Sequence, residues 1–262
     1  MKRYLLLASI LSFGFFFTNC SGTSLIDDTN LNTDGSAPIG ELQIATVHHL
    51  EDGTELEANP DGSKSLTNDL GYAIVLAEAE INWKSLKLVS AGNDEDCEAG
   101  HDQDLEINQS ESFLEEDLVS SLLSEHEIPM FAYCAYELTL APGTQGMAIK
   151  NHEGVDHGGG DHAPIGESFH LAGTWSKDGA NGSFHIDTID PVMVAGLFHA
   201  ATGEEHPLHF HEGEIAKEVL FGTEYDVLLQ GVDFQSQSED QQRDQVIANL
   251  SEAVHHDAEE AH

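Results

Sequence analysis

Short stretches in which hydrophobic and polar residues alternate recur along most of the chain. Turns rich in Gly, Asp, Asn and Pro, such as KDGANG, separate them. Two-residue alternation is typical of a β-strand that buries one face, and such turns commonly join strands. Strands are therefore predicted over residues 43–50, 71–83, 85–90, 131–140, 168–176, 182–189, 206–214 and 223–234.

Two other stretches have a helical pattern. Residues 110–129 carry leucines at four-residue spacing after Ser112, which has an acidic residue three positions later, as in a capping box. Ser238 and Gln241 repeat that spacing before an apolar stripe that runs to Val254. The sequence therefore predicts a mainly β domain, an antiparallel β-sandwich with a helical insertion and a C-terminal helix.

The first 19 residues have the pattern of a secretory signal, a basic start followed by an uncharged apolar stretch. The next residues, FTNC, resemble the lipobox of bacterial lipoproteins, although Phe17 and Asn19 depart from its usual residues. This resemblance implies that Cys20 carries the lipid. Under the sorting rule of enteric lipoproteins, Ser21 implies the outer membrane. The alternative is an ordinary secretory signal with a coincidental cysteine.

Domain boundaries follow from the changes in composition. Residues 1–19 are expected to be the signal peptide. Residues 20–42 are polar and poor in large apolar side chains, which is typical of a flexible tether, here a lipidated one. Residues 43–262 are expected to form a single β-rich domain with its helix at the C-terminus.

The charge of the chain is strongly negative, with 48 acidic and 9 basic residues and a formal net charge of −39. Such a chain repels a phosphate backbone, which excludes nucleic acid as a partner, and it attracts cations. A solvated acidic surface suited to a salty habitat is the plain alternative.

Cys97 and Cys134 are the two cysteines beyond Cys20. In an oxidising periplasm they are expected to form a disulfide. Alternation over residues 131–140 places Cys134 on the side expected to face the core. The other interpretation is a pair of thiolate ligands for a metal.

The first metal-binding candidate is HPLHFHEGE, residues 206–214. In a strand, His209 and His211 would share one face, and His206 stands close by in sequence. This stretch resembles the His-x-His motif of copper–zinc superoxide dismutases, although the order of the further ligands differs. The alternative is two surface histidines on a polar strand face.

The second candidate is the glycine-rich stretch HEGVDHGGGDHAP, which is similar to the mobile His/Asp-rich loops of periplasmic zinc-binding proteins. Because ordering a glycine-rich loop costs conformational entropy, moderate and exchangeable binding is expected. The alternative is an ordinary solvated loop. The ligands expected from it are His152, His157, His162 and Asp161.

Further histidines, including His170 and His185, lie on predicted strands, where a single histidine is more often structural than a ligand. His185 and Asp187 share a face, so His185 is kept as a candidate ligand. The tail histidines His255, His256 and His262 are expected to be incidental surface residues, and weak metal binding by the tail is the alternative.

Imidazole and carboxylate ligands suit Zn²⁺ first and Cu²⁺ second. Motifs such as GxSxG and HExxH are absent from the sequence, which favours binding over catalysis. We therefore expect a lipid-anchored periplasmic or outer-membrane protein that captures or buffers a divalent transition metal. A membrane metal transporter is a candidate partner. Two alternatives stay open: a metalloenzyme with a His-x-His copper or zinc centre, and a structural surface lipoprotein with incidental histidines.

Overall fold

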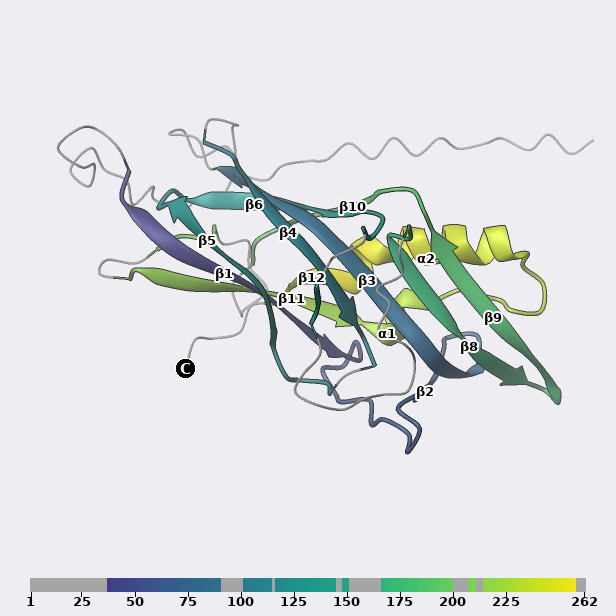
Figure 1. Cartoon of the computed structure of the whole chain (residues 1–262). Helices are drawn as coiled ribbons and strands as arrows, with labels where there is room; N and C mark the ends of the chain where they lie inside the picture. The colour runs from purple at the N-terminus through teal and green to yellow at the C-terminus, as the bar shows by residue number, and fades with distance from the viewer. Residues whose placement is uncertain are drawn as a thin grey trace, which may run out of the picture.

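The computed structural model describes residues 37–90, 101–114, 116–144, 148–150, 166–199, 207–210 and 214–257. Most of these residues lie in β-strands (Figure 1). The elements are β1 Ile39–His49, β2 Lys64–Thr67, β3 Ala73–Ser90, β4 Gln103–Ser112, β5 Ser121–Pro129, β6 Tyr133–Leu140, β7 Ala148–Lys150, β8 Phe169–Lys177, β9 Ala180–Thr188, β10 Val192–Leu197, β11 Ala216–Glu224, α1 Tyr225–Leu228, α2 Glu239–Ala253 and β12 Val254–Asp257.

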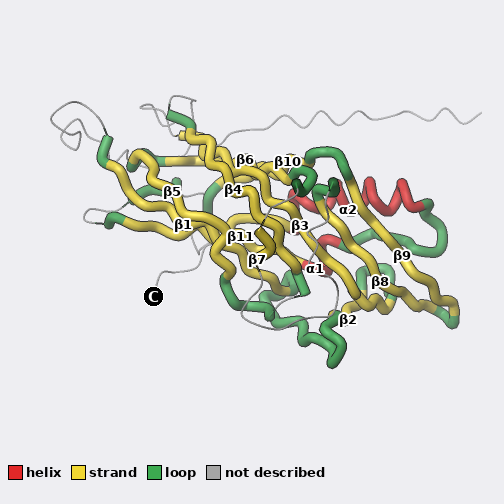
Figure 2. The backbone as a smooth tube through the Cα atoms, viewed as in Figure 1, coloured by secondary structure: helices red, strands yellow, loops and turns green. Residues whose placement is uncertain are grey.

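The strands form two sheets, as expected for a mainly β sandwich. The smaller sheet has the order β12-β11-β1-β5. The larger sheet has the order β10-β6-β3-β4-β7, with β2 and β8 also paired to β3 and β9 paired to β8. Antiparallel pairs predominate, whereas β1 with β11 and β4 with β7 are parallel. In Figure 2, β1, β5 and β11 lie at one end of the molecule and the β8–β9 hairpin lies at the other.

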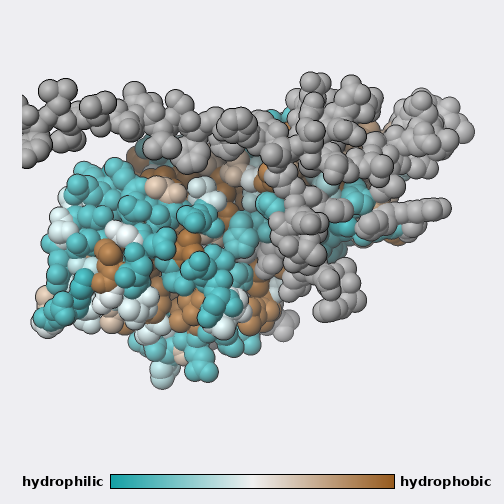
Figure 3. All heavy atoms as spheres, turned by 180° about the vertical axis from the view of Figure 1, so that it is seen from behind, coloured by the Kyte–Doolittle hydropathy of each residue, from teal (hydrophilic) through white to brown (hydrophobic). Residues whose placement is uncertain are grey.

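The C-terminal helix begins where the capping box predicts. The Ser238 side chain accepts the backbone N–H of Gln241, and the Gln241 side chain accepts that of Ser238. Val246 and Leu250 are buried on the side of α2 that packs against β9 and β10. Hydrophilic residues dominate the part of the surface that carries α2 when the molecule is seen from behind (Figure 3). After the helix, β12 adds an edge strand to the smaller sheet.

A buried carboxylate connects the two sheets in the core. Glu111 of β4 accepts hydrogen bonds from the Trp83 indole N–H at 2.8 Å and from the Thr46 hydroxyl of β1. The Nε2 atom of His48, also in β1, lies 3.3 Å from Glu111 Oε1. A second buried group joins Lys64, Asp117 and Tyr225 nearby. Buried polar groups of this kind need every partner, because a lost partner leaves a desolvated charge.

β3 changes its inward-facing side at a β-bulge. Ile74 and Leu76 are buried before the bulge, and Ala79 and Ile81 are buried after it. The pairing with β8 skips Ala77, because Leu76 lies opposite Gly173 and Glu78 lies opposite Ala172. This bulge explains why the buried residues have even numbers before it and odd numbers after it.

The helix predicted over residues 110–129 is wrong. Those residues complete β4, pass through turns and form β5, which pairs with β1. Leu118, one of the three leucines of the expected stripe, has a positive φ of 60° and is 53 % exposed. Pairing with β1 therefore outweighs the local helical pattern.

One predicted strand, over residues 223–234, does not form as expected, and the strand predicted over 206–214 lies only partly within the described residues. Residues 223–234 complete β11 and then form α1 and turns. Within 206–214, residues 207–210 contain only a bridge between Leu208 and Tyr133. Phe210 is buried there, against Gly40, where a Cβ would lie 2.7 Å from the Phe210 ring.

Other boundaries also differ from the expectation or are left open. β1 begins at Ile39, so residues 39–42, assigned above to the tether, belong to the sheet. Cys134 is buried in β6 as expected, whereas Cys97, Cys20 and the signal segment lie outside the described residues. No helix in the described part of the chain is long and apolar enough to span a bilayer.

Candidate metal centre

The β8–β9 hairpin brings two histidines together on the outer face of the larger sheet. Its turn contains Asp178 and Gly179, which both have positive φ values, 52° and 82°. Consecutive positive φ values are typical of the tight turn that an Asp-Gly pair favours. The register that follows pairs His170 with Asp187 and Ala172 with His185.

Side chains two residues apart on a strand point to the same face. Phe169 and Leu171 are buried, so His170 between them points away from the core. The neighbouring β3 contributes Glu80, directly opposite His170, and Glu78, opposite Ala172. The bulge at Ala77 places both carboxylates on this outer face, because the side of β3 that faces inward changes there.

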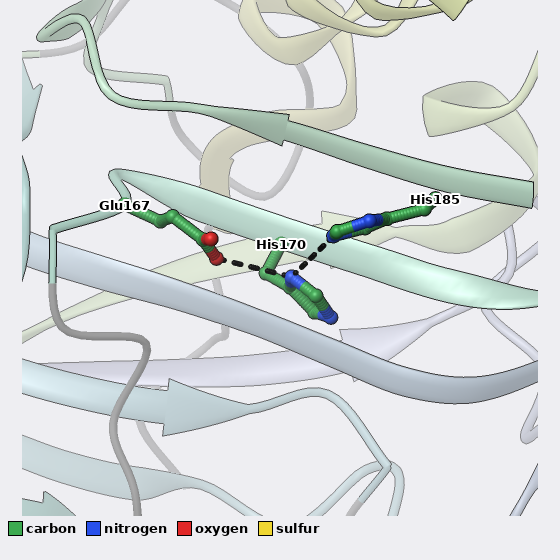
Figure 4. A group of neighbouring side chains, drawn as sticks. All are labelled: Glu167, His170 and His185. Atoms are coloured by element: carbon green, nitrogen blue, oxygen red, sulfur yellow. Dashed lines mark hydrogen bonds and ion pairs between the residues drawn. The ribbon is translucent and has the colours of Figure 1, made fainter.

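His170 lies at the centre of the cluster (Figure 4). Its Nδ1 atom is 3.0 Å from Glu167 Oε2 and 3.2 Å from His185 Nε2. Its Nε2 atom is 2.9 Å from Glu78 Oε2. One ligand atom from each of Glu167, His170 and His185 lies within 4.8 Å of the other two, which is close enough to share a metal ion. Asp187 lies 3.7 Å from His185 Nε2.

The contacts of His170 suit a metal ligand. A carboxylate can only accept a hydrogen bond, so His170 can donate from Nε2 to Glu78 or from Nδ1 to Glu167. In the neutral tautomer that keeps the proton on Nε2, Nδ1 has a lone pair for a metal ion. A carboxylate that fixes the tautomer of a ligating histidine is a usual feature of zinc sites. When the ring is protonated instead, both nitrogens can donate to carboxylates.

The surroundings of the cluster are negative. Four carboxylates, those of Glu78, Glu80, Glu167 and Asp187, lie around two imidazoles, and none of the four pairs with Lys or Arg among the residues described. Burial raises the pKa of Glu80, and the negative charges of Glu78 and Glu167 raise it further, while His170 opposes this. A divalent cation would relieve this repulsion.

The exposure of the ligands differs between the three residues. The His170 side chain is 13 % exposed, whereas that of His185 is 57 % exposed. Three protein ligands with one accessible side leave room for a water molecule or an exchanging ligand. The arrangement can therefore hold a metal ion that remains reachable from solvent.

Only part of the predicted set can be located. His185 joins the cluster, in agreement with its choice as a candidate ligand. His209 lies elsewhere, with Nδ1 2.9 Å from the Pro207 carbonyl, and it belongs to no group of three ligand atoms in the ranges described. The remaining candidates lie outside the described residues: His152, His157, Asp161, His162, His206 and His211.

The sequence places His170 on a predicted strand, where a single histidine is more often structural, and no local motif marks Glu167 or the acidic residues of β3 as ligands. The Asp-Gly turn does predict which residues of the two strands are paired, because a two-residue hairpin turn fixes the register of both strands. In this register, the residue numbers of every pair across the hairpin sum to 357, as for Lys177 with Ala180 and His170 with Asp187. The bulge in β3 and its pairing with β8 are tertiary features that no local pattern reveals.

No family model, curated protein or solved structure matches this chain.

Proposed function

We propose that this protein captures or buffers a divalent transition metal, zinc first and copper second. The observation that carries the proposal is the convergence of Glu167, His170 and His185 on one point of the sheet surface. Two imidazoles and a carboxylate are ligands that zinc prefers. The negative field of a chain with a net charge of −39 raises the local concentration of cations.

The histidine-rich segment before Glu167 deepens this proposal. His162 precedes Glu167 by five residues, so roughly 18 Å of extended chain at most separates their backbones. We assign His152, His157, Asp161 and His162 the role of collecting ions close to the more ordered cluster. His206, His209 and His211 are proposed as further metal ligands.

The place of this activity is the cell envelope. We propose that Cys20 is lipidated, that the chain is anchored in the outer membrane and that Cys97 bonds to Cys134. The resemblance of FTNC to a lipobox supports the first two assignments, and the burial of Cys134 suits the third. A membrane metal transporter is the proposed recipient of the ion. Loss of labelled fatty acid from a Cys20→Ser variant would test the anchor.

The metal content of the chain, purified without a His tag and analysed by inductively coupled plasma mass spectrometry, tests the function. We expect the chain to take up zinc or copper at neutral pH, and a variant with His170→Ala and His185→Ala to take up about one ion fewer per chain. His126→Ala is the matched control, because His126 lies on β5 and contacts Ser124. A chain that takes up neither zinc nor copper at neutral pH would overturn the proposal.

A metalloenzyme is the second candidate, favoured by the three protein ligands and the accessible side of the cluster. In that case a metal-bound water would be the reacting group. Zinc-dependent hydrolysis of an activated ester, lost with His170→Ala, would support it. Metal retention without hydrolysis would leave the binding function alone.

A further inference from the structure

A second group of potential ligands lies on the outer face of the smaller sheet, where β1, β11 and β12 run side by side (Figure 1). His49 of β1 is opposite Glu224 of β11, and His255 of β12 is opposite Gly222. The sequence suggests that the tail histidines are incidental. β12 instead places His255 beside two residues that are distant in sequence.

Gly222 opens the space between the two imidazoles. A Cβ atom at this position would lie 3.0 Å from His49 Nε2 and 3.3 Å from His255 Nε2. The two ring centroids are 6.2 Å apart, with an angle of 72° between the ring planes. Any residue other than glycine would therefore crowd both imidazole nitrogens.

The hydrogen bonding of His49 prepares it for a metal. Its Nδ1 atom is 2.8 Å from the backbone carbonyl of Leu50. A carbonyl oxygen can only accept, so Nδ1 carries the proton and the neutral ring has its lone pair on Nε2. That nitrogen faces the space above Gly222. His49 is also 7 % exposed, which limits exchange with solvent.

Glu224 supplies a carboxylate to the same group. Its Oε1 atom lies 3.9 Å from His255 Nε2, and its side chain is 13 % exposed. The ligand atoms of His49, Glu224 and His255 are spread more widely than those of the first cluster, which all lie within 4.8 Å of one another. Zinc binds imidazole nitrogen and carboxylate oxygen at about 2.0–2.2 Å, so an ion shared by the three would draw their side chains together.

We propose that His49, Glu224 and His255 form a second site for a divalent transition metal, distinct from the cluster on β8 and β9. Its ligands come from three neighbouring strands and are more buried than His185. The ion would connect the C-terminal strand to β1 and β11, so binding there would contribute to folding. The exposed cluster would exchange its ion, and this one would retain it.

The test uses the full chain with His170→Ala and His185→Ala, so that the first cluster is removed. Zn²⁺ and Co²⁺ are the probes, and retained metal, Co²⁺ absorption and the thermal unfolding midpoint are measured. We expect about one retained ion per chain and a higher midpoint with zinc. Adding Gly222→Ala or His255→Gln should weaken binding by at least about 100-fold, whereas His126→Gln should not.

Each outcome decides between the two sites. If the starting variant retains no metal, or if it binds equally well with Gly222→Ala and with His255→Gln, the second site is wrong. If His170→Ala and His185→Ala remove nothing and Gly222→Ala removes everything, the second site stands and the first is wrong. If Gly222→Ala fails to fold, as judged by circular dichroism, the partly exposed His255 decides the matter.

Discussion

The surroundings of single side chains in this protein shift their pKa values away from those of the isolated residues. Glu80 is the clearest case, because it is partly buried beside other carboxylates and its pKa is raised by that burial first and by Glu78 and Glu167 next. Asp233 is the opposite case. It accepts hydrogen bonds from Ser236 and Tyr72, which lower its pKa to about 2.

Glu80→Gln should raise the thermal unfolding midpoint of the metal-free chain by a few degrees at pH 7.5. A raised pKa means that the ionised carboxyl costs stability in the folded state, and glutamine removes that charge. Differential scanning calorimetry in the presence of a chelator measures this. Zinc should reduce the difference, because the ion offsets the same repulsion. An unchanged or lower midpoint would contradict the prediction.

Asp233→Asn should destabilise the chain in a pH-dependent way. Because the folded pKa of Asp233, about 2, lies below its ordinary value of 3.8, the carboxylate stabilises the fold above about pH 4. This advantage is lost as the pH falls through about 2. Urea unfolding between pH 2 and pH 6 should show the two midpoints converging at the acidic end. A constant difference across that range would argue against this origin.

At the scale of strands and helices, the pairing of elements determines which residues lie close together. The β8–β9 hairpin could be predicted from KDGANG, and with it the pairing of His170 and Asp187. The capping box of α2 could be predicted from Ser238 and Gln241. Residues 110–129 could not, because their leucine spacing favours a helix while pairing with β1 stabilises a strand. Glu167 joins the cluster through tertiary position, and no periodicity marks it.

Gly173→Ala should destabilise the larger sheet. A Cβ on residue 173 would lie 2.0 Å from the backbone oxygen of Val75, so β8 could not approach β3 at the bulge. We expect a loss of roughly 1–3 kcal/mol in the free energy of unfolding, together with weaker metal retention. Thr174→Ala, an exposed neighbour on β8, is the control in urea titrations. Wild-type stability in Gly173→Ala would mean that β8 can move away from β3 without cost.

At the scale of the whole molecule, the two sheets are joined by apolar packing and by the buried group around Glu111. Thr46 and His48 reach it from the smaller sheet, and Trp83 reaches it from the larger one. Composition predicts a strongly acidic surface, but it gives no sign that a glutamate would be 1 % exposed between the sheets. That position depends on how the layers stack.

Glu111→Ala should lower the free energy of unfolding by roughly 3–5 kcal/mol, because it leaves the buried donors around it without their acceptor. Glu111→Gln keeps an acceptor oxygen and should cost less. Chemical denaturation followed by Trp fluorescence reports both variants. Equal losses for the two variants would show that the intact carboxylate with both of its acceptor oxygens makes the position important, and that keeping the side-chain volume and one acceptor oxygen does not help.

The bulge at Ala77 has a consequence for how sequences of this kind can vary. Ala77 is the extra residue between Leu76 and Glu78, which pair with adjacent residues of β8. It matters through its position in the chain and not through the chemistry of its side chain. Replacing the residue leaves the bulge in place, whereas deleting it would make Leu76 and Glu78 adjacent, as their partners Gly173 and Ala172 already are. A chain shortened there would form a regular ladder with β8 and would still keep Glu78 and Glu80 on the outer face, so this position should tolerate the loss of one residue where an adjacent position would not.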